Sequence, residues 1–156
     1  MCAMTRESSR PRVIFVCTHN SARSQMAEGM LRAWAGDRFE VFSAGTEATR
    51  VRPEAIEVMR EIGIDIAMQH SKTLEPFLDE SFSWLVTVCD RARESCPTIP
   101  GVQRQAHWDV DDPSAADGDH EARVAAFRDA RDDLRHRVEA FIVERAADHD
   151  AATLPA

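Results

Sequence analysis

Apolar residues follow two patterns along this chain, short apolar segments and longer stretches with helical spacing. Four segments have strand character: residues 13–16, 39–43, 84–89 and 105–108. The first and third are apolar almost throughout, as is typical of central parallel strands buried on both faces. The second alternates apolar with polar positions, which indicates a strand with one face in the core.

The longer stretches predict helices. Apolar residues recur at helical spacing over residues 24–35, from Pro53 to Gly63, and over residues 119–144. Gly36 and Gly63 are typical helix stops, and Pro53 suits the first turn of a helix. Three weaker patterns are a short extended piece at 64–68, a short helix or turn at 74–78, and a polar segment at 90–95 able to begin a helix.

Strands that alternate with helices predict an α/β fold of three layers, α/β/α, around a four-stranded parallel sheet. We expect a single domain over residues 12–145, flanked by a disordered tail at 1–11 and a frayed tail at 146–156. Such sheets bind ligands at the carboxyl ends of their strands. Cys17, Ser43, Cys89 and the loop that carries Asp112 should therefore meet at one edge of the sheet.

The composition narrows the class of protein. The chain has 156 residues, of which 44% are hydrophobic and 29% charged, and this composition is typical of one globular domain. Its net charge of −8 argues against nucleic acid or an anionic membrane as a partner. We find no secretory signal or membrane span and expect a cytoplasmic monomer. In that reducing compartment, four cysteines indicate chemistry rather than structural disulfides.

The segment from the first strand to the first helix carries the clearest chemical pattern. Cys17 opens a tight loop, Arg23 follows six positions later, and Ser24 comes next. The backbone N–H groups of residues 17–23 can surround a tetrahedral oxyanion; the loop consists of Cys17, Thr18, His19, Asn20, Ser21, Ala22 and Arg23. The helix N-terminus favours a thiolate at Cys17, Arg23 offers a fork of donors, and Ser24 can donate to the sulfur. This pattern predicts attack by sulfur on a phosphate-like anion. The alternative is a strand-to-helix turn in which Cys17 only packs.

Two further cysteines and an acid complete the candidate set. If the segment between Cys89 and Cys96 is helical, the seven residues rise about 10.5 Å, whereas a disulfide needs Cα atoms within about 7 Å. The two cysteines can therefore pair only if that segment unwinds; each could instead be a packing or loop residue. Their spacing does not match a zinc site. Asp112 is the candidate general acid, with Asp109 and Asp111 as competitors that spacing does not reject.

Nearly the whole chain resembles the thioredoxin-coupled arsenate reductases, which are built on the low-molecular-weight protein tyrosine phosphatase (phosphotyrosine protein phosphatase I-like) fold. The resemblance is carried by residues 16–28, 43–45, 87–89, 96–97 and 107–113. The Cys-x₅-Arg-Ser loop is shared with the phosphatases, so the Cys89 and Cys96 pair is the discriminating feature. The acidic loop also reads Asp-Pro-Ser where the phosphatases typically have Asp-Pro-Tyr, and this chain has no tyrosine.

The resemblance implies a three-cysteine relay for arsenic detoxification. Cys17 attacks arsenate held by the loop and Arg23, and Asp112 protonates the leaving oxygen. Cys89 then attacks the Cys17–arsenic adduct, which releases arsenite and leaves a Cys17–Cys89 disulfide. Cys96 attacks Cys89 in turn, and thioredoxin reduces the resulting Cys89–Cys96 disulfide. No bound metal or flavin is required, and phosphate or sulfate should mimic arsenate.

Two positions depart from the family pattern. Some relatives bind potassium through residues that match Asn20, Glu28 and Ser43 together with an aspartate, and the matching position here is Lys72. An ammonium group there should repel the ion, so we expect no potassium dependence. Several relatives also have a cysteine inside the loop where this chain has Ala22, a difference that should not affect the relay.

Two other functions fit the sequence. A phosphatase acting on phosphotyrosine or small phosphoesters would use the same loop, because arsenate and phosphate share shape and charge. A non-enzymatic oxyanion or redox sensor could signal through a Cys89–Cys96 switch. Within the reductase hypothesis, glutaredoxin or another thiol could replace thioredoxin as the reductant.

Overall fold

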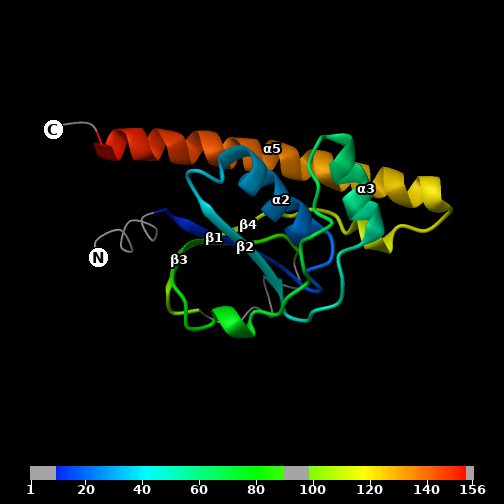
Figure 1. The fold of residues 1–156 in the computed structure, drawn as a ribbon, viewed down its shortest axis with the longest axis horizontal. Helices are drawn as coiled ribbons and strands as arrows, with labels where there is room; N and C mark the ends of the chain where they lie inside the picture. Colours follow the sequence, from blue (N-terminus) through cyan, green and yellow to red (C-terminus); the bar gives the residue numbers. More distant parts are fainter. Residues whose placement is uncertain (1–9, 90–98, 154–156) are drawn as a thin grey trace.

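The computed structural model describes residues 10–89 and 99–153, with side chains as far as Arg145. Its centre is a parallel sheet of four strands in the order β2-β1-β3-β4 (Figure 1). The strands are β1 (Arg12–Cys17), β2 (Glu40–Gly45), β3 (Phe82–Thr87) and β4 (Val102–His107). This order places β1 and β3 inside the sheet, in agreement with their continuous apolar sequences.

The register of the sheet brings the carboxyl ends of all four strands to one edge. Cys17 at the end of β1 lies level with Gly45 at the end of β2. On the other side, Val16 is level with Thr87 of β3, which is level with His107 of β4. The loops that follow these residues therefore surround the same space.

Three α-helices and two short 3-10 helices complete the described fold. They are α2 (Arg23–Ala35), α3 (Pro53–Glu61), η1 (Glu75–Phe77), η2 (Pro113–Ala115) and α5 (His120–Thr153). The helix α5 runs along one side of the molecule next to α2 and α3, while η1 lies on the opposite side of the sheet (Figure 1). The expected α/β fold with a four-stranded parallel sheet is confirmed.

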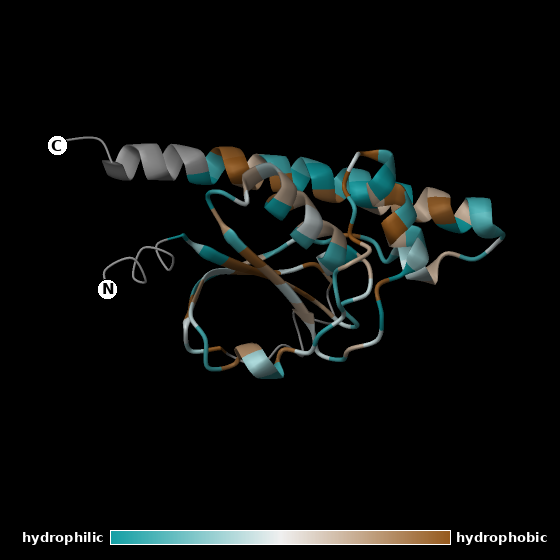
Figure 2. Cartoon of the chain, in the orientation of Figure 1, coloured by the Kyte–Doolittle hydropathy of each residue, from teal (hydrophilic) through white to brown (hydrophobic). Residues whose placement is uncertain are grey.

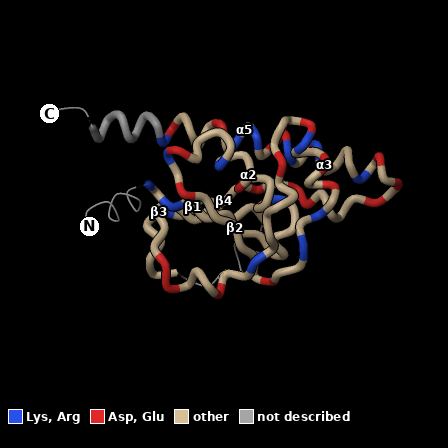
Figure 3. The backbone as a smooth tube through the Cα atoms, viewed as in Figure 1, with Lys and Arg blue, Asp and Glu red and all other residues tan. Residues whose placement is uncertain are grey.

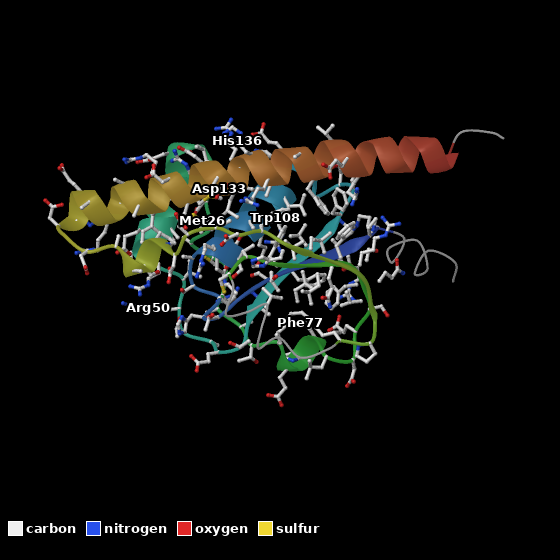
Figure 4. All side chains as sticks on the ribbon, turned by 180° about the vertical axis from the view of Figure 1, so that it is seen from behind. Met26, Arg50, Phe77, Trp108, Asp133 and His136 are labelled. Atoms are coloured by element: carbon white, nitrogen blue, oxygen red, sulfur yellow. The ribbon has the colours of Figure 1, made fainter. Side chains whose placement is uncertain are left out.

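Aromatic contacts join the layers. On one face, Phe15 of β1 contacts Trp108 with ring centroids 5.6 Å apart, and Trp108 contacts Phe141 of α5 at 6.2 Å. On the other face, Phe77 of η1 contacts Phe42 of β2 at 5.7 Å. Figure 4 shows Trp108 between the sheet and α5, with Phe77 on the far side. Aromatic side chains thus pack on both faces of the sheet. Parts of the strands are brown in Figure 2, the colour of hydrophobic residues.

Several element boundaries differ from those expected. β3 ends at Thr87, so Cys89 lies beyond the strand, although the Val88 N–H still bonds to the Val16 carbonyl at 2.9 Å. β4 begins at Val102 rather than at residue 105. The start was missed because the first residues of this edge strand include exposed polar side chains, which do not give the apolar pattern of a strand. Residues 64–68 form turns and irregular structure instead of an extended piece, whereas the short helix expected within 74–78 is present as η1.

The last helix is longer than its apolar pattern suggested. α5 continues to Thr153 instead of ending at residue 144, because no glycine or proline interrupts the sequence before Pro155. Positive and negative side chains are interspersed along its outer side (Figure 3), with i,i+4 pairs such as Arg137 with Asp133. Residues 1–9 of the tail expected at 1–11, and the helix start expected at 90–95, lie outside the described residues. Within the described residues, no helix is both long and apolar enough to cross a membrane.

An ion cluster on the surface joins α3 to α5. The Glu61 carboxylate accepts hydrogen bonds from Arg128 at 2.7 and 2.9 Å and from Arg131 at 2.7 Å. Arg131 is only 7% exposed and also donates to the Val58 carbonyl at 2.9 Å. The hydrogen bond from Arg128, aided by Arg131, lowers the pKa of Glu61 from 4.5 to about 2. Folding therefore favours the charged form of this carboxyl group.

We expect Glu61→Gln to lower the free energy of unfolding at pH 7 and to lose this effect in acid. A depressed pKa contributes stability above the unfolded value of 4.5, and that stability disappears as the pH falls toward about 2. Urea unfolding midpoints of both proteins, measured from pH 7 to the lowest pH at which they fold, would test this. Glu139→Gln, which removes an exposed pair with Arg135, is the control and should have a smaller effect. A stability gap that stays constant with pH would contradict the prediction.

Candidate active site

Cys17 lies at the carboxyl end of β1 and is 3% exposed. Its Sγ is 2.8 Å from the Ser24 Oγ and accepts a hydrogen bond from the Asn20 N–H at 3.2 Å. The contact expected between Ser24 and the sulfur is therefore present. The sulfur therefore lies between the Ser24 hydroxyl and the Asn20 backbone, at the start of the loop.

Asn20 organises the loop around this sulfur. Its φ of 50° is in the left-handed region, which asparagine tolerates better than most residues, and its side chain is fully buried. Its Nδ2 donates to the Ser24 Oγ at 2.8 Å and to the Ser43 Oγ at 3.0 Å. Its Oδ1 accepts from the Gln25 side chain and from the Lys72 N–H, both at 2.8 Å. One amide thus links the loop to α2, to β2 and to the segment after α3.

Helix α2 begins where the loop ends. Its N-cap residue, Ala22, has no side chain able to cap the helix, and the first turn contains no acidic residue. The N–H groups of that turn and the positive end of the helix are therefore directed to the space enclosed by the loop. This arrangement is suited to a bound oxyanion.

Arg23 reaches across to the far half of the sheet. Its guanidinium donates to the Val110 carbonyl at 2.9 Å and to the Val88 carbonyl at 3.4 Å. Its Nη2 lies 3.7 Å from the Asp112 Oδ1. The backbone after β3 and β4 therefore fixes the guanidinium at the mouth of the loop, with Asp112 beside it.

These groups line one cavity of about 360 Å³. Its lining consists of Cys17, His19, Ser21, Ala22, Arg23, Thr49, Arg50, Arg52, Asp112, Ser114 and Ala115. Asp112 is the acid on this lining, and Asp109 and Asp111 are not part of it. Asp112 is about half exposed and accepts a hydrogen bond from the Ser114 N–H at 2.9 Å, which fixes it at the start of η2.

Cys89 is the second cysteine brought to the loop. It is 5% exposed, and its Sγ lies 3.4 Å from the Thr18 Oγ1, next in sequence to Cys17. The ends of β1 and β3 meet as expected, so Cys17 and Cys89 both lie at the oxyanion loop. Cys96 lies outside the described residues.

Lys72 occupies the rear of the loop. Its Nζ is 3.7 Å from the Glu28 Oε1, 3.5 Å from the Ser43 Oγ and 2.7 Å from the His70 carbonyl. Glu28 is 4% exposed and also accepts from Ser43 and from Arg32. Burial lowers the pKa of Lys72, and the nearby Glu28 partly offsets this effect.

Three features of the site were not predicted from the sequence. The Thr18 hydroxyl contacts Cys89, and Arg50 and Arg52 line the cavity. Gly45 has no room for a side chain, because a Cβ there would lie 2.6–2.8 Å from backbone atoms of residues 18, 20 and 47. The Ser-Ala-Gly sequence at the end of a strand was the available signal for Gly45, whereas nothing marked the two arginines. His19 is at the surface, with its ring 3.3 Å from Glu47.

Comparison with known proteins agrees with this geometry. The family model described as low molecular weight phosphotyrosine protein phosphatase matches residues 12–151. The chain belongs to this family of enzymes.

Among its relatives are arsenate reductases. The arsenate reductase of Halalkalibacterium halodurans is 43% identical over 129 residues, which cover 83% of this chain and 93% of the relative. A solved arsenate reductase in the phosphate-binding state has a TM-score of 0.72 and 32% identity, covering 86% of this chain and 98% of that one. The low-molecular-weight protein tyrosine phosphatase from T. tengcongensis has a TM-score of 0.69 and 26% identity, covering 86% and 99%.

We expect Gly45→Ala to abolish tight phosphate binding. The new Cβ must displace backbone atoms at residues 18 and 20, which belong to the loop, and should also cost about 1–3 kcal/mol of stability. Calorimetric titration with phosphate and urea unfolding would measure the two effects.

Gly29→Ala is the matched control. Its Cβ would meet the Ile66 side chain at 2.6 Å, away from the loop, so stability should fall while phosphate binding persists. Phosphate affinity in Gly45→Ala equal to that of the wild type would refute the role given to this close contact.

Proposed function

We propose that this enzyme reduces arsenate to arsenite with Cys17, Cys89 and Cys96 as its thiol relay. The observation that carries the proposal is the placement of a second thiol at the oxyanion loop, where the Cys89 Sγ lies 3.4 Å from the Thr18 hydroxyl. A phosphatase needs only the first thiol. The arsenate reductases among the relatives support the same assignment.

The first step is nucleophilic. Arsenate binds to the loop N–H groups and to Arg23, and the Cys17 sulfur forms a bond to arsenic. One oxygen leaves as water, for which Asp112 supplies the proton. Asp112 lies 3.7 Å from Arg23, so this acid is next to the anion that Arg23 binds.

The second step moves the electrons. The Cys89 sulfur attacks the Cys17 sulfur, so a disulfide forms, the sulfur–arsenic bond breaks, and its electron pair stays on arsenic as arsenite. Cys96 then attacks Cys89, which frees Cys17 and leaves a Cys89–Cys96 disulfide. A dithiol of the thioredoxin type reduces that bond, with glutaredoxin or another thiol as the alternative reductant.

One turnover without added reductant should consume two protein thiols. We expect a Cys2→Ser background to lose about two of its three cysteine thiols when arsenate is added without oxygen, with release of arsenite. The thiols can be counted on denatured protein, and the disulfide mapped to Cys89 and Cys96. The Cys96→Ser variant should complete this single turnover and then stop, because its Cys17–Cys89 disulfide cannot be passed on.

A phosphatase is the second candidate function. Cys17, Arg23 and Asp112 line one cavity, and this set is sufficient for phosphoester hydrolysis through a phosphorylated cysteine. The same experiment separates the two functions. Rapid phosphoester hydrolysis with no loss of thiols to arsenate would show a phosphatase and would eliminate the relay.

We also propose that the ammonium group of Lys72 takes the place of a potassium ion. The positions that hold potassium in some relatives correspond here to Asn20, Glu28, Ser43 and Lys72. They do not fit the ion, because the Lys72 Nζ already lies 3.7 Å from the Glu28 carboxylate and 3.5 Å from the Ser43 hydroxyl. A second cation in this space would be repelled.

The wild-type rate should therefore be equal in potassium chloride and in choline chloride at the same ionic strength. Lys72→Met should reduce the rate about tenfold, equivalent to roughly 1.4 kcal/mol. Lys72→Asp should regain activity only when potassium is added, since it restores an oxygen ligand. Arg60→Met, at an exposed pair with Asp65, is the control. Potassium activation of the wild type would contradict the proposal.

A further inference from the structure

The cavity above the loop is larger than a single oxyanion requires. The loop encloses one tetrahedral anion, whereas the cavity has a volume of about 360 Å³. Pockets that bind organic molecules have volumes of about 300–1,000 Å³. The space beyond the loop is therefore sufficient for an organic group attached to the anion.

The outer part of this cavity carries positive charge without partners. Arg50 and Arg52 line it, and in the described part of the chain neither side chain has a hydrogen bond or ion pair. The acidic residue on the lining, Asp112, is already 3.7 Å from Arg23. His19, on the same rim, has Glu47 within 3.3 Å. In a protein of net charge −8, two unpaired arginines at one cavity are a local exception.

The backbone fixes this segment against the oxyanion loop. The Arg52 N–H donates to the Ser21 carbonyl at 2.8 Å, and the Thr49 hydroxyl lies 3.5 Å from the His19 carbonyl. Pro53 favours the extended conformation of Arg52, whose φ is −67° and ψ is 135°. Figure 4 shows Arg50 at the end of the molecule where η2 also lies, in agreement with the shared cavity lining.

Helix stability does not account for Arg52. It is the N-cap of α3, where a positive side chain opposes the positive end of the helix and provides no capping acceptor. By contrast, Glu54 in the first turn of the same helix has the charge that a helix N-terminus favours. The position of Arg52 instead suits a ligand with negative charge.

We infer that Arg50 and Arg52 form a second anion subsite, so that the cavity takes organic phosphates that carry another negative group. The phosphate, or an arsenate in its place, occupies the loop, while a carboxylate or second phosphate binds to the two guanidinium groups. The inference rests on the oxyanion loop of the proposed function. Its consequence is that such molecules compete with arsenate more strongly than phosphate does.

Binding of non-hydrolysable phosphonates to the reduced full-length protein tests this directly. The probes are inorganic phosphate, ω-phosphonocarboxylates with spacers of two to four carbons, their neutral carboxamides, and bisphosphonates of the same lengths. At about 50 mM salt, we expect at least one charged probe to bind about tenfold more tightly than its amide, because the second charge adds a charge-assisted contact. A gain with either second anion supports the subsite, and the larger gain identifies the preferred group.

Variants show whether the second negative group binds to Arg50 and Arg52 or responds only to the overall charge of the protein. Arg50→Gln/Arg52→Gln should reduce the advantage of the second charge to about twofold or less, while inorganic phosphate loses far less affinity. Arg38→Gln is the matched control, since Arg38 is exposed and precedes β2 at the opposite edge of the sheet. It should leave the advantage unchanged.

The outcomes distinguish the two proposals. If inorganic phosphate does not bind to the wild type, the oxyanion loop and the subsite both fail. If phosphate binds but acids and amides bind equally at every spacer length, only the subsite is overturned. An advantage that survives in the Arg50→Gln/Arg52→Gln variant also overturns it, because the second charge is then held elsewhere.

Discussion

The buried amide of Asn20 is the constraint on which the site depends. Its left-handed backbone turns the loop so that its N–H reaches the Cys17 sulfur, while its side chain bonds to Ser24, Ser43 and Gln25. Each such bond contributes about 1 kcal/mol, but a buried polar group left without its partner costs about 1–3 kcal/mol. The loop, the helix that follows it and strand β2 therefore have to form together.

The parallel register of the sheet brings the other residues of the candidate site next to this loop. Because Cys17 ends level with Gly45, and Val16 with Thr87, the segments after three strands meet without any long-range adjustment. Arg23 then spans the sheet through the Val88 and Val110 carbonyls. The candidate nucleophile, Cys17, and the candidate acid, Asp112, follow different strands, and the Arg23 guanidinium lies between these two segments.

The sequence was sufficient for the features that depend on local pattern. The strand-loop-helix around Cys17, the parallel sheet and the approach of the acidic loop to the same edge follow from apolar runs, spacing and strand order. The choice of Asp112 over Asp109 and Asp111 on the cavity lining needed the structure. Features that depend on contacts between distant segments could not be read in this way. The Thr18–Cys89 contact joins residues 71 positions apart, and the unpaired state of Arg50 is visible only when all possible partners are placed. The β4 boundary was missed for a different reason, since an edge strand can be polar and still pair.

The charge distribution explains how an acidic protein can attract an anion. A net charge of −8 repels arsenate, but salt largely screens this repulsion at distances beyond the Debye length of about 10 Å. Inside the cavity, the arginines act at short range and with less screening. Behind the loop, Glu28 would place a negative charge near the same anion, and the ammonium of Lys72 and the guanidinium of Arg32 lie against that carboxylate. These two cations offset the charge of Glu28 at the rear of the site, so the positive groups at its mouth act on an incoming anion without opposition from that carboxylate.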